Sequence, residues 1–198
     1  MEGKYFLKDH NEPLEKHEHI VFEFEDGGDL RYHDTRKFGR MCLVPIHLLE
    51  SYEPVHKQGI EPIDSRLNKD YLYEKIHKSN LPIKSLLLDQ TIISGLGNIY
   101  ANEVMFGAKV NPFKTGKEVT IEECDRMVIS SREIIQRAIE CGGTTIRSYT
   151  SQLGVTGRFQ QNLFVHKRDG ENCFVCNEPI LKEFIGGRST YYCAKCQK

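Results

Sequence analysis

The chain has 198 residues, of which 39% are hydrophobic, and its formal net charge at pH 7 is −1. This length and composition can bury a sizeable core and allow more than one structural unit. No apolar run approaches the roughly 18 residues of a membrane span and no signal peptide opens the sequence, so we expect a cytoplasmic protein without a membrane partner.

A β-hairpin is the first predicted element. Between residues 20 and 33, Ile20, Phe22 and Phe24 alternate with their neighbours, and Asp26-Gly27-Gly28 supplies turn residues. A further short strand is expected at residues 41–44. Residues 53–64 contain two prolines and a glycine, which predicts a linker.

After this linker the hydrophobic period changes from two to about 3.6, which predicts helices. Pro82 suits the first turn of one helix, and Thr120 with Glu123 forms a capping-box signature at the start of another, which Gly142-Gly143 ends. The helices are expected at residues 68–78, 82–89, 98–107 and 121–141. Residues 147–165 are then expected to form a loop that leads into a strand at 163–166.

Four cysteines near the end of the sequence form two Cys-x2-Cys pairs, Cys173 with Cys176 and Cys193 with Cys196, separated by sixteen residues. This spacing predicts one structural zinc ion held by four thiolates, because a hairpin between the pairs brings them together. The other three cysteines are interpreted as free thiols in a reducing compartment.

The segment between the two pairs places Arg188 beside Gly186-Gly187, at or near a hairpin tip. Two interpretations remain open for this side chain. It is either an exposed arginine on a zinc ribbon or part of a finger that grasps phosphate, since the planar guanidinium suits phosphate oxygens. Residues 144–198 carry 8 basic and 4 acidic side chains, whereas residues 1–63 carry 8 and 13. A local basic excess at the finger is typical of phosphate contact.

A glycine turn, Gly95-Leu96-Gly97-Asn98, lies between two predicted helices. Backbone amides at the start of the second helix can face an anion there. The turn is not a dinucleotide-binding fingerprint, because the third glycine of that pattern would fall at Tyr100 and no strand precedes it. By itself, such a short motif is more typical of a helix–helix turn whose glycines are needed for steric reasons.

Residues 88–103 closely resemble the helix–two-turn–helix signature of bacterial formamidopyrimidine-DNA glycosylases. Asp34-Thr35-Arg36-Lys37-Phe38-Gly39 resembles the D-x-R-x-F-G loop of this family, and Arg188-Ser189-Thr190 with the four cysteines resembles its finger. The resemblance implies an α+β fold in four parts. These are a remnant of an N-terminal β-sandwich domain (1–60), a helical helix–two-turn–helix domain (64–145), a lesion-capping loop with a connecting strand (146–170), and a C-terminal β-hairpin zinc finger (171–198).

The resemblance also implies roles for individual residues. Met1 and Phe38 would be inserted into DNA beside a flipped base, and Arg36 would face the estranged cytosine. Without the family, a salt-bridged arginine and a packed aromatic would be the expected roles of residues 36 and 38. Arg188 would donate a proton in δ-elimination as well as binding phosphate. Further DNA contacts are expected at His17, Lys84 and Asn98, and the lesion-capping loop would contain Gly154, Gly157, Arg158 and Phe159.

The implied activity is base excision by a monomer that acts on double-stranded DNA with an oxidised purine, such as 8-oxoguanine, or an abasic site. The family uses an N-terminal proline as nucleophile and a later lysine. Here the sequence opens with Met1-Glu2-Gly3, similar to the end of the family's His-Leu-x-Met-x-Gly loop. We therefore expect an amino-terminally truncated glycosylase that is inactive as given. The alternatives are a non-catalytic zinc-dependent binder of damaged or bent DNA, and the sibling class that acts on oxidised pyrimidines. Residues 34–39 favour the purine branch.

Overall fold

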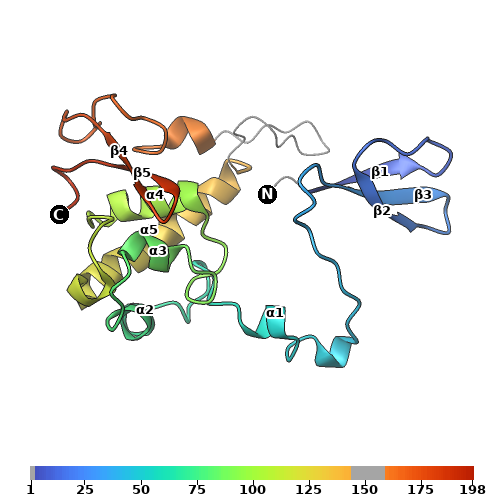
Figure 1. Ribbon diagram of the computed structural model, residues 1–198, viewed down its shortest axis with the longest axis horizontal. Coiled ribbons are helices and arrows are strands. Elements are labelled where there is room, and N and C mark those ends of the chain that lie inside the picture. The colour runs from blue at the N-terminus through green and yellow to red at the C-terminus, as the bar shows by residue number, and fades with distance from the viewer. Residues whose placement is uncertain (1–2, 144–158) are drawn as a thin grey trace.

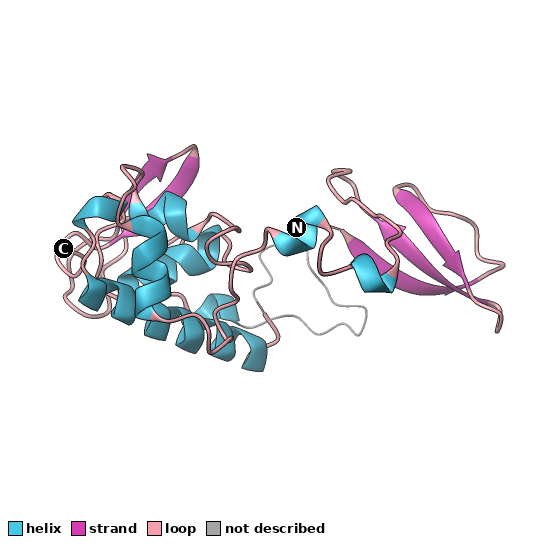
Figure 2. Cartoon of the chain, turned by 90° about the horizontal axis from the view of Figure 1, so that it is seen from below, coloured by secondary structure: helices cyan, strands magenta, loops and turns pink. Residues whose placement is uncertain are grey.

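The computed structural model describes residues 3–143 and 159–198. A three-stranded sheet lies at one end of the long axis, and a helical body with a small β-hairpin lies at the other (Figure 1). An extended segment with short helices joins the two parts, and the same separation is visible from below (Figure 2). The predicted α+β class is confirmed.

The sheet consists of β1 (Lys4–Asp9), β2 (Glu18–Glu23) and β3 (Gly28–His33) in the order β1-β3-β2, with both pairs antiparallel. The predicted hairpin corresponds to β2 and β3, and Gly27 in their turn has a φ of 87°. β1 was not predicted. The strand expected at residues 41–44 is wrong: this segment has no regular structure and Leu43 is fully exposed. β3 already has a strand on each side, so residues 41–44 find no partner there.

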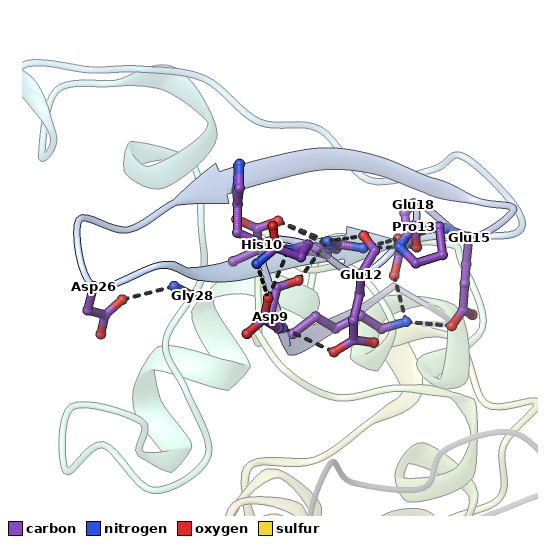
Figure 3. Close-up of polar contacts among 12 residues, drawn as sticks. Asp9, His10, Glu12, Pro13, Glu15, Glu18, Asp26 and Gly28 are labelled. Atoms are coloured by element: carbon purple, nitrogen blue, oxygen red, sulfur yellow. Dashed lines mark hydrogen bonds and ion pairs between the residues drawn. The ribbon is translucent and has the colours of Figure 1, made fainter.

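A buried arginine holds the β1–β2 loop against one face of the sheet. Arg31 donates to the carboxylates of Asp29 and Glu18, at 3.0 and 3.3 Å from Nη2 and Nη1. It also donates to the backbone carbonyls of Pro13 and Glu12. Figure 3 shows these loop groups gathered over the strands. The loop is therefore fixed by ionic hydrogen bonds, which satisfy the charge of a side chain only 1% exposed.

The connecting segment contains a 3-10 turn, Ile46–Leu48, and the one-turn helix α1 (Glu53–His56). The predicted linker at residues 53–64 is thus partly helical. It meets the helical body where Ile60 forms a parallel bridge to Ile93.

The helical body confirms the four predicted helices: α2 (Lys69–Ile76), α3 (Ile83–Leu87), α4 (Asn98–Gly107) and α5 (Ile121–Glu140), with a 3-10 turn at Gly116–Glu118. The capping box of α5 forms as predicted: Thr120 Oγ1 accepts from the Glu123 amide at 3.2 Å, and the Glu123 carboxylate accepts from the Thr120 amide at 3.0 Å. The largest fully buried apolar side chains of this core are Leu67, Leu72, Ile76, Ile83, Leu87, Ile93, Leu96, Met105 and Met127.

The C-terminal part contains a 3-10 helix, Phe159–Asn162, and the antiparallel strands β4 (Leu181–Ile185) and β5 (Arg188–Tyr192). The predicted hairpin between the cysteine pairs is confirmed. The strand expected at residues 163–166 is wrong, because three amides of this segment bind the buried carboxylate of Glu103 instead of a neighbouring strand. Among the helices in the described residues, none is long and apolar enough to cross a bilayer.

Candidate functional site

Four cysteine thiols converge at the base of the β4–β5 hairpin. The Sγ atoms of Cys173, Cys176, Cys193 and Cys196 all lie within 4.8 Å of one another. The Cys173–Cys196 and Cys176–Cys193 distances are 4.0 and 3.4 Å. Sulfurs about 2.3 Å from a tetrahedral metal would be about 3.8 Å apart, so the arrangement fits a four-thiolate metal ion. A hydrogen bond from the Glu178 backbone lowers the pKa of Cys176 to about 7, whereas burial raises the pKa of Cys193 and raises that of Cys196 to about 12. A bound cation would therefore be needed to hold all four sulfurs as thiolates.

The metal-binding hairpin packs directly on the helical body. Phe106 of α4 joins Val165, Ile180 and Tyr191 in an apolar cluster that includes Cys173 and Cys193. Gln197, at the end of the hairpin, donates from Nε2 to the Val110 carbonyl at 2.9 Å. The finger therefore has a fixed position relative to α4, although its own core is small.

The start of β5 is held by two polar side chains from the helices. Lys84 of α3 donates from Nζ to the Ser189 carbonyl at 2.7 Å and to Thr190 Oγ1 at 2.8 Å. Asn98, the first residue of α4, donates from Nδ2 to the same Ser189 carbonyl at 3.1 Å. Arg188, one residue earlier, is exposed. Three predicted site residues, Lys84, Asn98 and Arg188, therefore meet at this junction.

Lys84 occupies an unusual position for a cation. Its side chain is 0% exposed, and burial followed by the nearby Arg188 charge lowers its pKa to about 8. Both of its recorded acceptors are uncharged finger atoms. In this arrangement Lys84 contacts the finger and supports the residue next to Arg188.

The glycine turn before α4 is shaped by Gln90. Gln90 Oε1 accepts from the Gly95 amide at 2.8 Å, and its Nε2 donates to the Leu96 carbonyl at 2.9 Å. Gly95 has a φ of 84°, a conformation that L side chains rarely adopt. Gly97 caps α4 without a side-chain hydrogen bond, so the first amides of α4 remain suited to an anion.

Two consecutive residues of α4 anchor the segment that precedes the finger. The Glu103 carboxylate accepts from the amides of Phe164, Val165 and His166 at 2.7, 3.0 and 2.8 Å. Burial outweighs these bonds and raises the pKa of Glu103. Asn102 Nδ2 lies 2.8 Å from His166 Nδ1, and burial lowers the pKa of that imidazole to about 4. A neutral His166 can therefore accept from Asn102.

At the other end of the molecule, the carboxylate of Asp34 organises the loop that carries Arg36 and Phe38. It accepts from the backbone amides of Arg36 and Gly39, both at 3.0 Å, and from the Tyr32 hydroxyl at 3.1 Å. These bonds, with the Gly39 amide contributing most, lower the pKa of Asp34 to about 2. A Cβ on Gly39 would lie 1.9 Å from Tyr32 Oη, so a side chain at this position would displace the Tyr32 hydroxyl that donates to Asp34.

The two predicted insertion residues of this loop form one stacked unit. The Arg36 guanidinium lies 4.6 Å from the centroid of the Phe38 ring, and Phe38 is 59% exposed. His17, a half-buried residue with a φ of 77°, lies at the start of β2, close to the loop. The structure thus groups His17, Arg36 and Phe38 at the sheet, and Lys84, Asn98 and Arg188 at the helical body.

Four predicted residues, Met1, Gly154, Gly157 and Arg158, lie outside the described residues. Phe159, the last residue predicted for the lesion-capping loop, is 3% exposed and packs with Ala138 and Leu163. Its ring also lies 5.6 Å from that of Tyr100 in an edge contact. Phe159 therefore anchors one end of this segment on the helical body.

Comparison with known proteins places this geometry in a family. Residues 58–150 match the model of the formamidopyrimidine-DNA glycosylase H2TH domain, and residues 1–41 match that of the formamidopyrimidine-DNA glycosylase N-terminal domain. A formamidopyrimidine-DNA glycosylase of Oceanobacillus iheyensis is 42% identical over 197 residues, which cover 100% of this chain and 70% of the relative. The chain belongs to the formamidopyrimidine-DNA glycosylase family.

Other members of the formamidopyrimidine-DNA glycosylase family show a similar degree of likeness to this chain. The Bacillus licheniformis relative is 45% identical over 201 residues, covering 100% of this chain and 72% of its own length. A complex of a Lactococcus lactis FPG mutant with Fapy-dG containing DNA has a TM-score of 0.91, and a complex of L. lactis Fpg with abasic site containing DNA has one of 0.89. Both are 39% identical and cover 100% of this chain and 72% of theirs. The predicted family resemblance is confirmed.

Several residues of the site in this glycosylase-family chain were not predicted from the sequence. Gln90 shapes the glycine turn, Thr190 accepts from Lys84, and Glu103 with Asn102 fixes the segment before the finger. A signal existed for residues 102 and 103: they are a polar pair inside an otherwise apolar helix, where a buried polar side chain needs a partner. Gln90 and Thr190 lie within the segments that resemble the family, but no local pattern predicts their partners, which are set by tertiary structure.

Proposed function

We propose that this chain acts in base-excision DNA repair, by recognising duplex DNA that contains an oxidised purine or an abasic site. The observation that carries the proposal is the likeness to L. lactis Fpg in complex with DNA bearing such lesions, which extends over 100% of this chain. The two groups of site residues described above, one on each part of the molecule, suit a protein that grips a duplex from two sides.

In this proposal the helical body holds the DNA backbone. Arg188 is an exposed guanidinium at the start of β5, and Asn98 stands at an α4 terminus whose first amides lack a side-chain cap. Both are suited to phosphate oxygens. Arg188 is also the residue we assign to the proton transfer of δ-elimination. Lys84 contributes to DNA binding by holding Ser189 and Thr190, and hence Arg188, in place.

In the same proposal, side chains of the loop that follows β3 enter the duplex. Removing a base from the stack costs a few kcal/mol and leaves a hole that an apolar group can fill. Phe38 is exposed and apolar, and Arg36 stacked on it offers donors to an orphaned cytosine. Met1 is assigned the same wedge role from the family resemblance. A guanidinium poised for cytosine favours purine lesions over the oxidised-pyrimidine class.

The metal of the four-cysteine site is proposed to be one structural zinc ion. Tetrahedral thiolate geometry is the preference of zinc in proteins, and four protein ligands leave no position for substrate. Zinc would therefore fix the position of Arg188 through the hairpin and take no part in bond breaking.

A second candidate function is binding without excision by the 198-residue polypeptide itself. The amine beside Arg188 is that of Lys84, which is 0% exposed and hydrogen-bonded, so it is poorly placed to attack a sugar. Because this amine is buried and hydrogen-bonded, we expect it to form no complex trapped by borohydride on abasic DNA. A trapped complex would show that an amine of this polypeptide can act as the nucleophile.

The proposed function is tested by fluorescence anisotropy with two duplexes, one with a stable abasic analogue opposite cytosine and one undamaged. We expect tighter binding to the abasic duplex. Arg188→Ala should weaken binding and reduce the slope of log K against log salt by about 0.9 if one phosphate contact is lost. Lys195→Ala, on the same finger but between the metal ligands, is the matched control. Equal affinity for the two duplexes would refute the proposal.

A further inference from the structure

Three histidines gather at the end of the sheet where β2 begins and β3 ends. The ring of His17 lies 5.7 Å from that of His33 and 6.2 Å from that of His19, both in edge contacts. His17 ends the β1–β2 loop, His19 lies at the irregularity in β2, and His33 ends β3. These residues, referred to below as the histidine cluster, are brought together by strand pairing.

The surroundings of the histidine cluster are cationic. Lys16 and Lys37 both disfavour a charge on His17, and Lys4 lies opposite His33 in the strand register. The two nearest carboxylates in sequence are engaged elsewhere. Glu18 binds Lys8 and Arg31, and the Asp34 carboxylate accepts backbone amides of its own loop.

The positions of the rings are held by features that an incidental cluster would not need. His17 has a φ of 77°, a left-handed conformation that histidine adopts more often than most non-glycine residues, and its carbonyl accepts from the Asp34 amide at 3.0 Å. His19 donates from Nε2 to the Asp34 carbonyl at 2.9 Å, which fixes its tautomer. His33 Nδ1 is buried and makes no hydrogen bond.

We propose that the histidine cluster is a proton-coupled phosphate site, which binds a phosphate of the DNA backbone most tightly when its imidazoles are protonated. This inference rests on the proposed function, and it goes beyond a single contact at His17 by including His19 and His33. It also makes the grip of the sheet on DNA dependent on pH.

The sign of the pH dependence follows from the surroundings. Burial, then Lys16, His33, His19 and Lys37, lower the pKa of His17, so its ring is neutral in the free protein at pH 7.5. A phosphate dianion or diester in the cluster favours the charged ring and raises that pKa. By linkage, affinity for the phosphate rises as pH falls, by up to about tenfold per pH unit for each proton taken up.

The first arm of the test uses inorganic phosphate and NMR titration of the imidazole Cε1–H signals. We expect phosphate to raise the apparent pKa of His17 and of at least one other member of the cluster. The matched control is His10, at the far end of β1, whose Nδ1 is 3.0 Å from the Asp29 carboxylate. Its titration should not change. Unchanged titration of all three clustered histidines would overturn the proposal.

The second arm measures duplex binding between pH 6 and 8 for the wild type and for His17→Gln, His33→Phe and His10→Gln. His33→Phe keeps an aromatic ring against Phe6, which His33 contacts at 6.0 Å, so the fold is preserved. We expect the first two variants to lose at least half of the slope of log K against pH, and His10→Gln to keep it. If His17→Gln and His33→Phe keep the wild-type slope of log K against pH, the inference is overturned, but the proposed function stands. Absence of duplex binding at every pH, with phosphate still shifting the cluster, would overturn the proposed function and support the phosphate site.

Discussion

Removal of the Glu103 carboxylate should be among the most damaging single changes to this fold. Glu103→Ala leaves the amides of Phe164, Val165 and His166 without their acceptor. An unsatisfied buried amide costs about 1–3 kcal/mol, so three give about 3–9 kcal/mol. Water can reach Phe164, which is 39% exposed, and the cost of burying the carboxylate is removed. We therefore expect a loss of about 3–5 kcal/mol in the free energy of unfolding.

A second variant, Glu103→Gln, tests whether the loss of stability follows the number of hydrogen bonds removed. Both Val165 and His166 donate to Oε1, which an amide oxygen can replace, whereas Phe164 donates to Oε2, where an NH2 group would oppose it. We expect a loss of about 1–3 kcal/mol, between that of Glu103→Ala and that of the exposed control Glu178→Gln. Urea denaturation with zinc present measures the free energies, and hydrogen exchange follows the three amides. A loss below about 1 kcal/mol for Glu103→Ala, or unchanged protection of these amides, would refute the reasoning.

Three further outcomes are expected. Cys193→Ser should reduce zinc from about one ion per chain to a small fraction of that, by metal analysis of reduced protein, and full retention would contradict a four-thiolate site. The pKa of the Asp34 carboxyl group is about 2 in the folded protein and 3.8 when unfolded, so this group stabilises the fold above pH 3.8. That stabilisation is lost as pH falls from 3.8 towards 2. The NMR signals of the amides of residues 36–39 should report this transition in the wild type and not in Asp34→Asn. Lys84 has a pKa lowered from 10.5 to about 8, so the unfolded chain binds more protons between these values and stability should rise with pH across that window. In Lys84→Met, urea denaturation should give the same free energy of unfolding at pH 7.5 and at pH 9.5. If the free energy of unfolding of this variant still rises with pH, another group causes the rise.

Local patterns predicted much of the fold because the deciding interactions are local. The capping box of Thr120 and Glu123, the start of α4 at Asn98 and the turn of the metal-binding hairpin all involve groups a few residues apart. The four-cysteine site could also be predicted from the sequence, since the spacing of the cysteines reflects the geometry of one metal site.

The errors arose where a distant partner decides the structure. Residues 163–166 have the composition of a strand, but their amides are bound by Glu103, some sixty residues earlier. The burial of Lys84 under Thr190 also depends on a contact that no local pattern encodes, while the DNA contact predicted for Lys84 stays a prediction. Residues 41–44 are all apolar, which suits a strand, yet they pair with neither β1 nor β2, the two edge strands of the sheet. The roles of individual residues at the proposed interface came from the family resemblance, and they remain predictions.

The contact between Lys84 and Thr190 joins residues 106 positions apart, and this has a consequence during synthesis. At roughly 5–20 residues per second, the ribosome needs on the order of 5–20 s to deliver Thr190 after Lys84. Through that interval the lysine of α3 is hydrated and charged, and the Ser189 carbonyl that will also engage Asn98 does not yet exist. The amine is buried only when the hairpin docks. Synthesis of the β4–β5 hairpin and closure of the α3–α4 surface are therefore expected to be coupled in one event that follows the folding of the helices.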